Sequence, residues 1–297
     1  MRSFFIYTIS FTAILSVSFC SNSGPMNDTH YSLGNPDRTY VLPVSLNEIS
    51  GITLIDNDHL ACVQDEIGTI YIYDLVKGAI TKEYSTKLIG DYEGIALVGK
   101  IMYLLRSDGV IVECSDYTSV DAEIKEYNLQ LPSGNNEGLC YDKANNRLLI
   151  AAKTKPGKGS ENKDVRLIYE FNLLTKKRES NHLFKIHVEQ LEQKAKELDL
   201  PIPYKTNKKT GKQYSAFNFR TSEIAVHPVS GWLYILSAND KLLLLTDPKG
   251  NFINLVSLPP EIFNKAEGIT FLSNADMLIS NEAQSEKATL LSFSYRK

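Results

Sequence analysis

Asn136-Glu137-Gly138-Leu139 stands near the middle of the chain and opens a short apolar segment. A glutamate in the same setting returns four times, as Glu48-Ile49-Ser50-Gly51-Ile52, Glu93-Gly94-Ile95, Glu223-Ile224-Ala225 and Glu267-Gly268-Ile269. Successive glutamates are separated by 45, 44, 86 and 44 residues. A fixed period of this size predicts an architecture built from internal repeats.

Each repeat also carries the pattern of several short strands. A second apolar run ends in a polar group at Gln64-Asp65-Glu66, Ser107-Asp108, Lys153, Asn239-Asp240 and Asn281-Glu282. Third and fourth strands follow after polar turns such as Asp247-Pro248-Lys249-Gly250. Four short antiparallel strands with a period near 44 residues are typical of a β-propeller blade. The sequence therefore predicts an all-β fold, a β-propeller.

The long interval between Glu137 and Glu223 leaves the number of blades open between five and six. Its strand-like runs only complete the unit that residues 138–141 begin, whereas residues 188–200 have helical spacing and are stopped by Pro201. We therefore expect five blades with a helical insertion at about residues 188–220, and six blades as the alternative.

The last repeat ends one strand short. Residues 39–44 precede the first glutamate and have the apolar, β-branched character of a strand. We expect this segment to supply the missing outer strand and to close the ring, because an open ring would leave exposed strand edges.

The N-terminus has the features of an export signal. Arg2 is followed by an uncharged stretch from Phe4 to Phe19, which is too short for a comfortable membrane span. Residues 1–20 are expected to be a signal peptide of the lipoprotein type with Cys20 as the lipidated residue, and because Phe19 is bulky for that motif, an ordinary cleaved signal or an uncleaved anchor is the alternative. Residues 21–38 then form a tether, residues 39–297 the propeller, and the protein lies in the periplasm or on a membrane of the bacterial cell envelope.

Composition narrows the function classes. The chain is 43% hydrophobic and has a net charge of -3, so it has enough apolar material for a core and no general attraction to nucleic acid. Cys62, Cys114 and Cys140 lie in or beside apolar runs and are expected to be buried thiols, with one disulfide as the alternative.

The ordered blade motifs resemble the SdiA-regulated (YjiK/CarP-like) β-propeller family over about residues 39–297. The resemblance rests on residues 46–51, 91–95, 136–139, 222–228 and 266–269. It implies an envelope-associated propeller with a link to calcium, and it supplies no catalytic residues.

The repeated glutamates form the candidate site. Because the first strand of each blade lines the central channel, we expect the five side chains to converge near one mouth. They would hold a hard cation such as calcium, with Asp65, Asp108 or Glu282 as further candidate ligands. The alternative is that each carboxylate accepts backbone N–H groups where two blades meet. The predicted metal ligands are Glu48, Glu93, Glu137, Glu223 and Glu267.

Two functions follow from this site. The chain lacks a nucleophile elbow, a phosphate-binding loop and zinc-ligand spacing, which favours a non-enzymatic binding or scaffold module for a protein or small-molecule ligand. A calcium-dependent hydrolase with the metal at the channel mouth is the alternative. The lysines of residues 205–212 could in addition dock an anionic partner.

Overall fold

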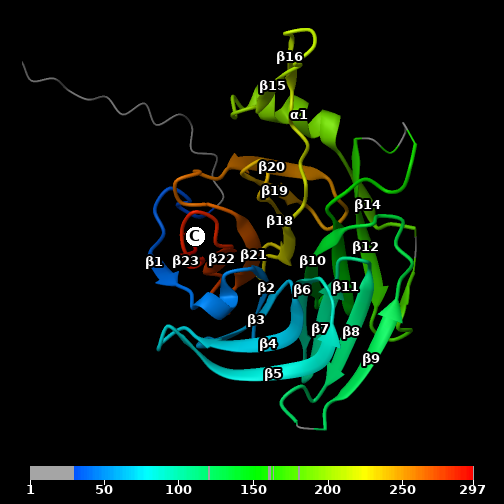
Figure 1. Ribbon diagram of the computed structural model, residues 1–297, viewed down its shortest axis with the longest axis vertical. Helices are drawn as coiled ribbons and strands as arrows, with labels where there is room; N and C mark the ends of the chain where they lie inside the picture. Colours follow the sequence, from blue (N-terminus) through cyan, green and yellow to red (C-terminus); the bar gives the residue numbers. More distant parts are fainter. Residues whose placement is uncertain (1–29, 120, 160–161, 163, 180, 297) are drawn as a thin grey trace, which may run out of the picture.

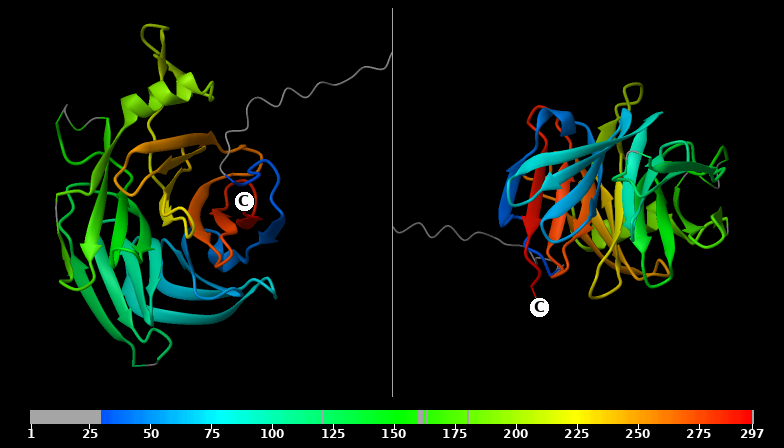
Figure 2. Two further views of the ribbon diagram at one scale, coloured as in Figure 1. Left: turned by 180° about the vertical axis from the view of Figure 1, so that it is seen from behind. Right: turned by 90° about the horizontal axis from the view of Figure 1, so that it is seen from below.

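The computed structural model describes residues 30–119, 121–159, 162, 164–179 and 181–296. Five antiparallel sheets of four or five strands stand around a common axis, as the predicted propeller requires (Figure 1, Figure 2). Five blades, and not six, account for the described chain.

Each blade begins at the channel and runs outward. Blade 1 contains β2 (Ile49–Leu54), β3 (His59–Gln64), β4 (Ile67–Asp74) and β5 (Ala79–Ile89). Blade 2 contains β6 (Tyr92–Val98), β7 (Ile101–Arg106), β8 (Val110–Ser115) and β9 (Glu123–Asn128). Blade 3 contains β10 (Asn136–Asp142), β11 (Arg147–Ala152) and β12 (Val165–Asn172), with β13 (Lys177–Arg178) and β14 (Phe184–His187) both paired to β12. Blade 4 contains β17 (Glu223–Val226), β18 (Leu233–Ser237), β19 (Leu242–Thr246) and β20 (Phe252–Ser257).

The ring closes as predicted. Blade 5 combines β21 (Ala266–Phe271), β22 (Met277–Asn281) and β23 (Thr289–Phe293) with the N-terminal β1 (Arg38–Val41). In the pairing register Tyr40 lies opposite Leu290. The two ends of the chain thus share one sheet, which protects the outer edge of β23. A short 3-10 turn, η1 (Val44–Leu46), leads from β1 into blade 1.

The predicted insertion follows β14 directly. It consists of α1 (Val188–Glu197) and a separate hairpin of β15 (Tyr204–Thr206) and β16 (Gln213–Ser215). The helix is three residues shorter than the helical spacing suggested, and its buried face, Val188, Leu191 and Ala195, packs on the core between blades 3 and 4. The expected helical insertion is therefore present between blades 3 and 4.

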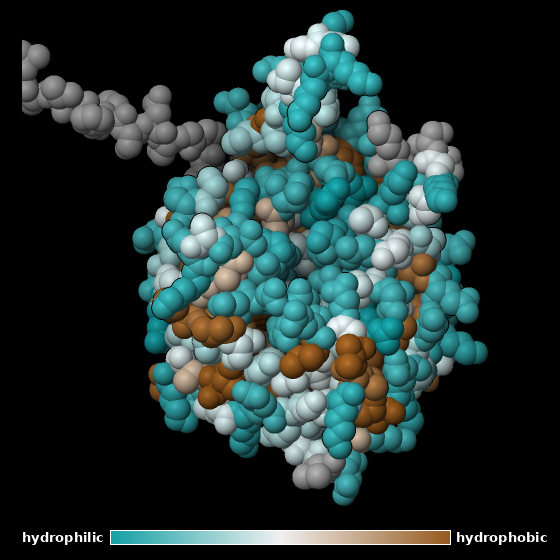
Figure 3. Space-filling model, in the orientation of Figure 1, coloured by the Kyte–Doolittle hydropathy of each residue, from teal (hydrophilic) through white to brown (hydrophobic). Residues whose placement is uncertain are grey.

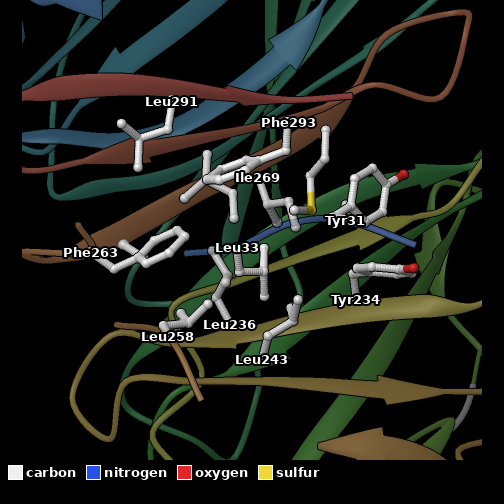
Figure 4. Packing of buried hydrophobic residues seen from close by; sticks show 14 of the residues in the cluster. Tyr31, Leu33, Tyr234, Leu236, Leu243, Leu258, Phe263, Ile269, Leu291 and Phe293 are labelled. Atoms are coloured by element: carbon white, nitrogen blue, oxygen red, sulfur yellow. The ribbon is translucent and has the colours of Figure 1, made fainter. Parts of the chain in front are cut away.

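The hydrophobic core is divided into five layers, one between each pair of neighbouring blades. The layer between blades 4 and 5 also holds Tyr31 and Leu33 from the segment before β1 (Figure 4). The Tyr31 hydroxyl lies 2.9 Å from Nε2 of His227 and donates to the Ala275 carbonyl at 2.6 Å. Burial lowers the pKa of His227 to about 4. The last residues of the predicted tether are thus packed on the propeller.

Cys62, Cys114 and Cys140 are free thiols, and the first two are buried, as expected of small core residues. The predicted signal peptide and Cys20 lie outside the described residues. Within the described ranges no helix is long and apolar enough to cross a membrane.

Candidate functional site at the channel mouth

A β-bulge near the start of the innermost strand creates the site. The register with the second strand slips by one residue in β2, β6, β10 and β21. A bulge leaves the extra residue unpaired and re-aims its side chain. The residues at the bulge are Ser50, Glu93, Glu137 and Glu267.

The strand register shows that the five predicted ligands do not all occupy equivalent positions in their blades. Glu93, Glu137 and Glu267, here called the bulge glutamates, occupy equivalent positions. Glu48 does not, because the bulge of blade 1 holds Ser50 and Glu48 lies two residues earlier with an exposed side chain. The innermost strand of blade 4, β17, pairs with β18 without a bulge, and Glu223 lies directly opposite Leu236. Three of the five predicted ligands therefore occupy equivalent positions in their blades.

Glu223 is a buried clamp between two blades. Its Oε1 accepts the backbone N–H of Leu139 in blade 3 at 2.6 Å and its neighbour Ile224 at 2.9 Å. Each innermost strand pairs on one edge only, so N–H groups on its other edge need acceptors. Burial raises the pKa of Glu223 well above the ordinary value, and the two N–H donors oppose that shift. This residue performs the alternative role expected for the whole set.

The bulge glutamates influence one another. Burial and the Asp91 carboxylate raise the pKa of Glu93 to about 8, and burial with repulsion from Glu93 and Glu267 raises that of Glu137 to about 9. Burial also raises the pKa of Glu267. Carboxyl groups that share a site in this way retain protons at a pH where exposed glutamates are ionised.

Two lysines balance this acidic cluster. Lys153, at the end of the second strand of blade 3, forms an ion pair with Glu137. Lys265 lies 3.2 Å from Glu267 Oε1 and also pairs with Glu282. In the sequence Lys265 stands two residues before Glu267 and Lys153 follows the second apolar run of its repeat, but a pattern of oxygen donors does not indicate these cation partners.

A cavity of about 350 Å³ opens beside these groups. Arg220 and Lys241 add two further cations to its wall, which Ser222, Asn239, Asn264 and Gln284 complete. Lys241 donates to the Asn264 carbonyl, and burial lowers its pKa. Neither Arg220 nor Lys241 has a carboxylate partner among the ion pairs of the described residues. The wall of the cavity therefore carries four cations and two buried carboxyls.

Another part of the mouth, around Asp65, is acidic. Burial and repulsion from Glu48 and Glu282 raise the pKa of Asp65 to about 6. Asp108, another suggested ligand, instead forms an ion pair with Arg106 at 2.5 Å. The mouth thus has a basic side formed by blades 3 to 5 and an acidic side formed mainly by blade 1.

Several contacts of the five glutamates are relevant to the predicted calcium site. Lys153 and Lys265 already supply positive charge to two of them, and Glu223 is bound to backbone N–H groups. Among the described residues no three His, Cys, Asp or Glu side chains are grouped so that they could hold a metal ion. The calcium site stays a prediction that these contacts do not test.

Fold and site together define a five-bladed propeller with a charged channel mouth. The family model described as SdiA-regulated matches residues 36–283, and the chain belongs to this family. No curated protein sequence matches the chain.

Solved structures with a similar fold are distant in sequence. The glutaminyl cyclase of Myxococcus xanthus is 14% identical with a TM-score of 0.55, over 87% of this chain and 94% of that protein. A luciferin-regenerating enzyme is 10% identical with a TM-score of 0.52, over 88% of this chain and 95% of the enzyme. At these identities the similarity concerns the propeller fold alone.

Proposed function

We propose that this protein is an envelope-associated binding module that recognises a small charged ligand at the channel mouth. The observation that carries the proposal is the cavity of about 350 Å³ whose wall combines four cations with buried Glu137 and Glu267. The location in the envelope rests on the export signal predicted for residues 1–20 from the sequence.

An unsatisfied oxygen supports a ligand-binding role. Oε2 of Glu137 has no hydrogen-bond partner among the described residues, although the side chain is only 2% exposed. Burying a polar atom without a partner costs free energy, so such atoms are uncommon unless something else satisfies them. A ligand donor in the adjoining cavity would do so.

The charges indicate the class of ligand. Arg220 and Lys241 offer hydrogen-bond donors to an anionic group such as a carboxylate or phosphate. Glu137 and Glu267 can accept from an ammonium or hydroxyl group of the same molecule. The cavity volume lies at the lower end of the range for small-molecule sites, about 300–1,000 Å³. The ligand is therefore a small zwitterion or a hydroxylated anion.

The experiment is calorimetric titration of the full chain with L-glutamate, citrate and glucose 6-phosphate, and with glucose as a neutral comparison. We expect a charged compound to bind and glucose not to bind. Lys241→Gln should weaken that binding by tenfold or more, whereas Lys100→Gln, an exposed lysine outside the cavity, should leave it unchanged. Absence of binding by all three charged compounds would contradict the proposal.

Calcium is a second candidate ligand, favoured by the acidic side of the mouth around Asp65. Titration with calcium chloride tests it separately, because Lys241→Gln should not weaken cation binding. Heat that is lost in Asp65→Asn, with no response to the organic anions, would favour calcium over the anionic ligand.

A further inference from the structure

The hairpin of residues 204–215 is separate from the propeller sheets. β15 and β16 pair only with each other, and the hairpin projects beyond α1 at the edge of the molecule (Figure 1, Figure 2). Tyr204 and Tyr214 are 58% and 52% exposed. A projecting ribbon of this kind can contact a flat surface without interference from the blades.

The hairpin is strongly basic. It carries Lys205, Lys208, Lys209 and Lys212 and no acidic residue. All four lysines are exposed, and the described ion pairs include none of them. The neighbouring helix is different, because Lys194 pairs with Glu197 and Lys196 with Glu192. The positive charge of the hairpin is thus concentrated and uncompensated.

The turn holds two of these lysines in a defined place. The Asn207 side chain accepts the backbone N–H groups of Lys209 at 2.9 Å and Thr210 at 3.1 Å. Gly211 has a φ of +70°, which allows the chain to reverse direction between β15 and β16. Lys208 and Lys209 are therefore presented at the tip.

The composition distinguishes a lipid surface from a protein partner. Protein interfaces are depleted of lysine and need an apolar centre, but residues 204–215 contain no aliphatic side chain. Clusters of lysines bind anionic phospholipid headgroups, and tyrosine is favoured at membrane–water interfaces. Lys205 lies opposite Tyr214 in the register, so one face of the ribbon carries both types. In Figure 3 the projecting tip at the top is teal and white, and hydrophobic atoms appear only beneath it.

We propose that the hairpin of residues 204–215 contacts an anionic phospholipid surface through its four lysines and Tyr214. This contact is independent of the ligand site in the channel. It would hold the propeller in a fixed orientation on a membrane, in addition to any N-terminal attachment.

Vesicle co-sedimentation of the full chain tests the proposal. Vesicles of phosphatidylglycerol mixed with phosphatidylcholine are compared with phosphatidylcholine alone, and only the difference counts, because the apolar N-terminal stretch could bind both. Each lysine removed should weaken the phosphatidylglycerol-dependent binding by about fivefold at low salt. The variant Lys205→Gln/Lys208→Gln/Lys209→Gln/Lys212→Gln should thus lose it.

A matched variant separates this local effect from net charge. Lys82→Gln/Lys100→Gln/Lys143→Gln/Lys177→Gln removes the same charge from exposed positions on blades 1 to 3 and should bind like the unmodified protein. Raising the salt from about 0.1 M to 1 M, which shortens the screening length from about 10 Å to about 3 Å, should abolish the difference. The proposal is overturned if the hairpin variant keeps its preference for phosphatidylglycerol, if both variants lose it equally, or if no preference exists. Binding to soluble polyglutamate, together with no binding to the phosphatidylglycerol vesicles, would also refute the proposal.

Discussion

The Glu223 carboxylate of blade 4 accepts the Leu139 backbone N–H of blade 3 at 2.6 Å. The two residues are far apart in the sequence, and the 188–220 insertion lies between them. The contact therefore joins blades 3 and 4 directly, whereas the chain connects them through this long insertion. It lies at the channel, where the innermost strands have N–H groups without a strand partner.

Replacing Glu223 tests this clamp. Glu223→Ala leaves the Leu139 and Ile224 N–H groups without their acceptor and opens a cavity, so the free energy of unfolding should fall by about 2–4 kcal/mol. Glu223→Gln keeps an acceptor oxygen and should cost less. Urea unfolding measures both, and Glu48→Ala, at an exposed side chain, should change stability by less than about 0.5 kcal/mol. An equal effect of all three substitutions would contradict the clamp.

The raised pKa values of the bulge glutamates predict a pH dependence of stability. The folded-state pKa of Glu93 is about 8 against an unfolded value near 4.5, so folding favours the protonated form. This contribution to stability is complete below about pH 4.5 and is lost as the pH rises toward 8.

Glu93→Gln mimics the protonated side chain. Because the Glu93 side chain is only half-buried, water offsets part of the cost of ionisation, and we expect the variant to be more stable than the unmodified protein by about 1–2 kcal/mol at pH 8–9 and equal to it near pH 4.5. Thermal melts across this range measure the difference, with Glu261→Gln, an exposed position, as the control. A constant difference at all pH values would show that Glu93 does not titrate as described.

The period of the glutamates predicted the blades, the missing strand of the last repeat predicted the closure, and the helical spacing of residues 188–200 predicted the insertion, because each is visible as a local pattern in the sequence. Whether the glutamates occupy equivalent positions depends on a register shift of one residue between the first and second strands of a blade. The repeated sequence motif does not reveal this shift. Ser50 takes the bulge in blade 1, and Glu223 takes the place of the glycine in blade 4. The lysine partners could not be assigned either, since Lys153 reaches Glu137 only after β10 and β11 pair.

Because the N-terminal strand closes the ring, substitutions at two neighbouring residues of this segment should differ greatly in their effect on the free energy of unfolding. Leu42 is 4% exposed and packs in the layer between blades 5 and 1, whereas the adjacent Val41 is 56% exposed. Leu42→Ala should lower the free energy of unfolding by about 2–4 kcal/mol, and Val41→Ala by less than about 0.5 kcal/mol. Chemical denaturation measures both. Similar values for the two variants would mean that the N-terminal strand is not part of the cooperative unit.

The glycine after each bulge glutamate is explained by the approach of neighbouring strands. A Cβ at Gly138 would lie 2.9 Å from the Ile224 backbone nitrogen and 2.9 Å from the Ala151 Cβ, which leaves no room for a methyl group. Gly138→Ala should therefore force β10 and β17 apart and cost about 1–3 kcal/mol. It should also weaken the Glu223–Leu139 contact. Gly134→Ala, where a Cβ would meet no atom within 4 Å, is the matched control. Hydrogen exchange at the Leu139 amide should accelerate in Gly138→Ala only; unchanged exchange there would show that the blades tolerate the added methyl group without separating.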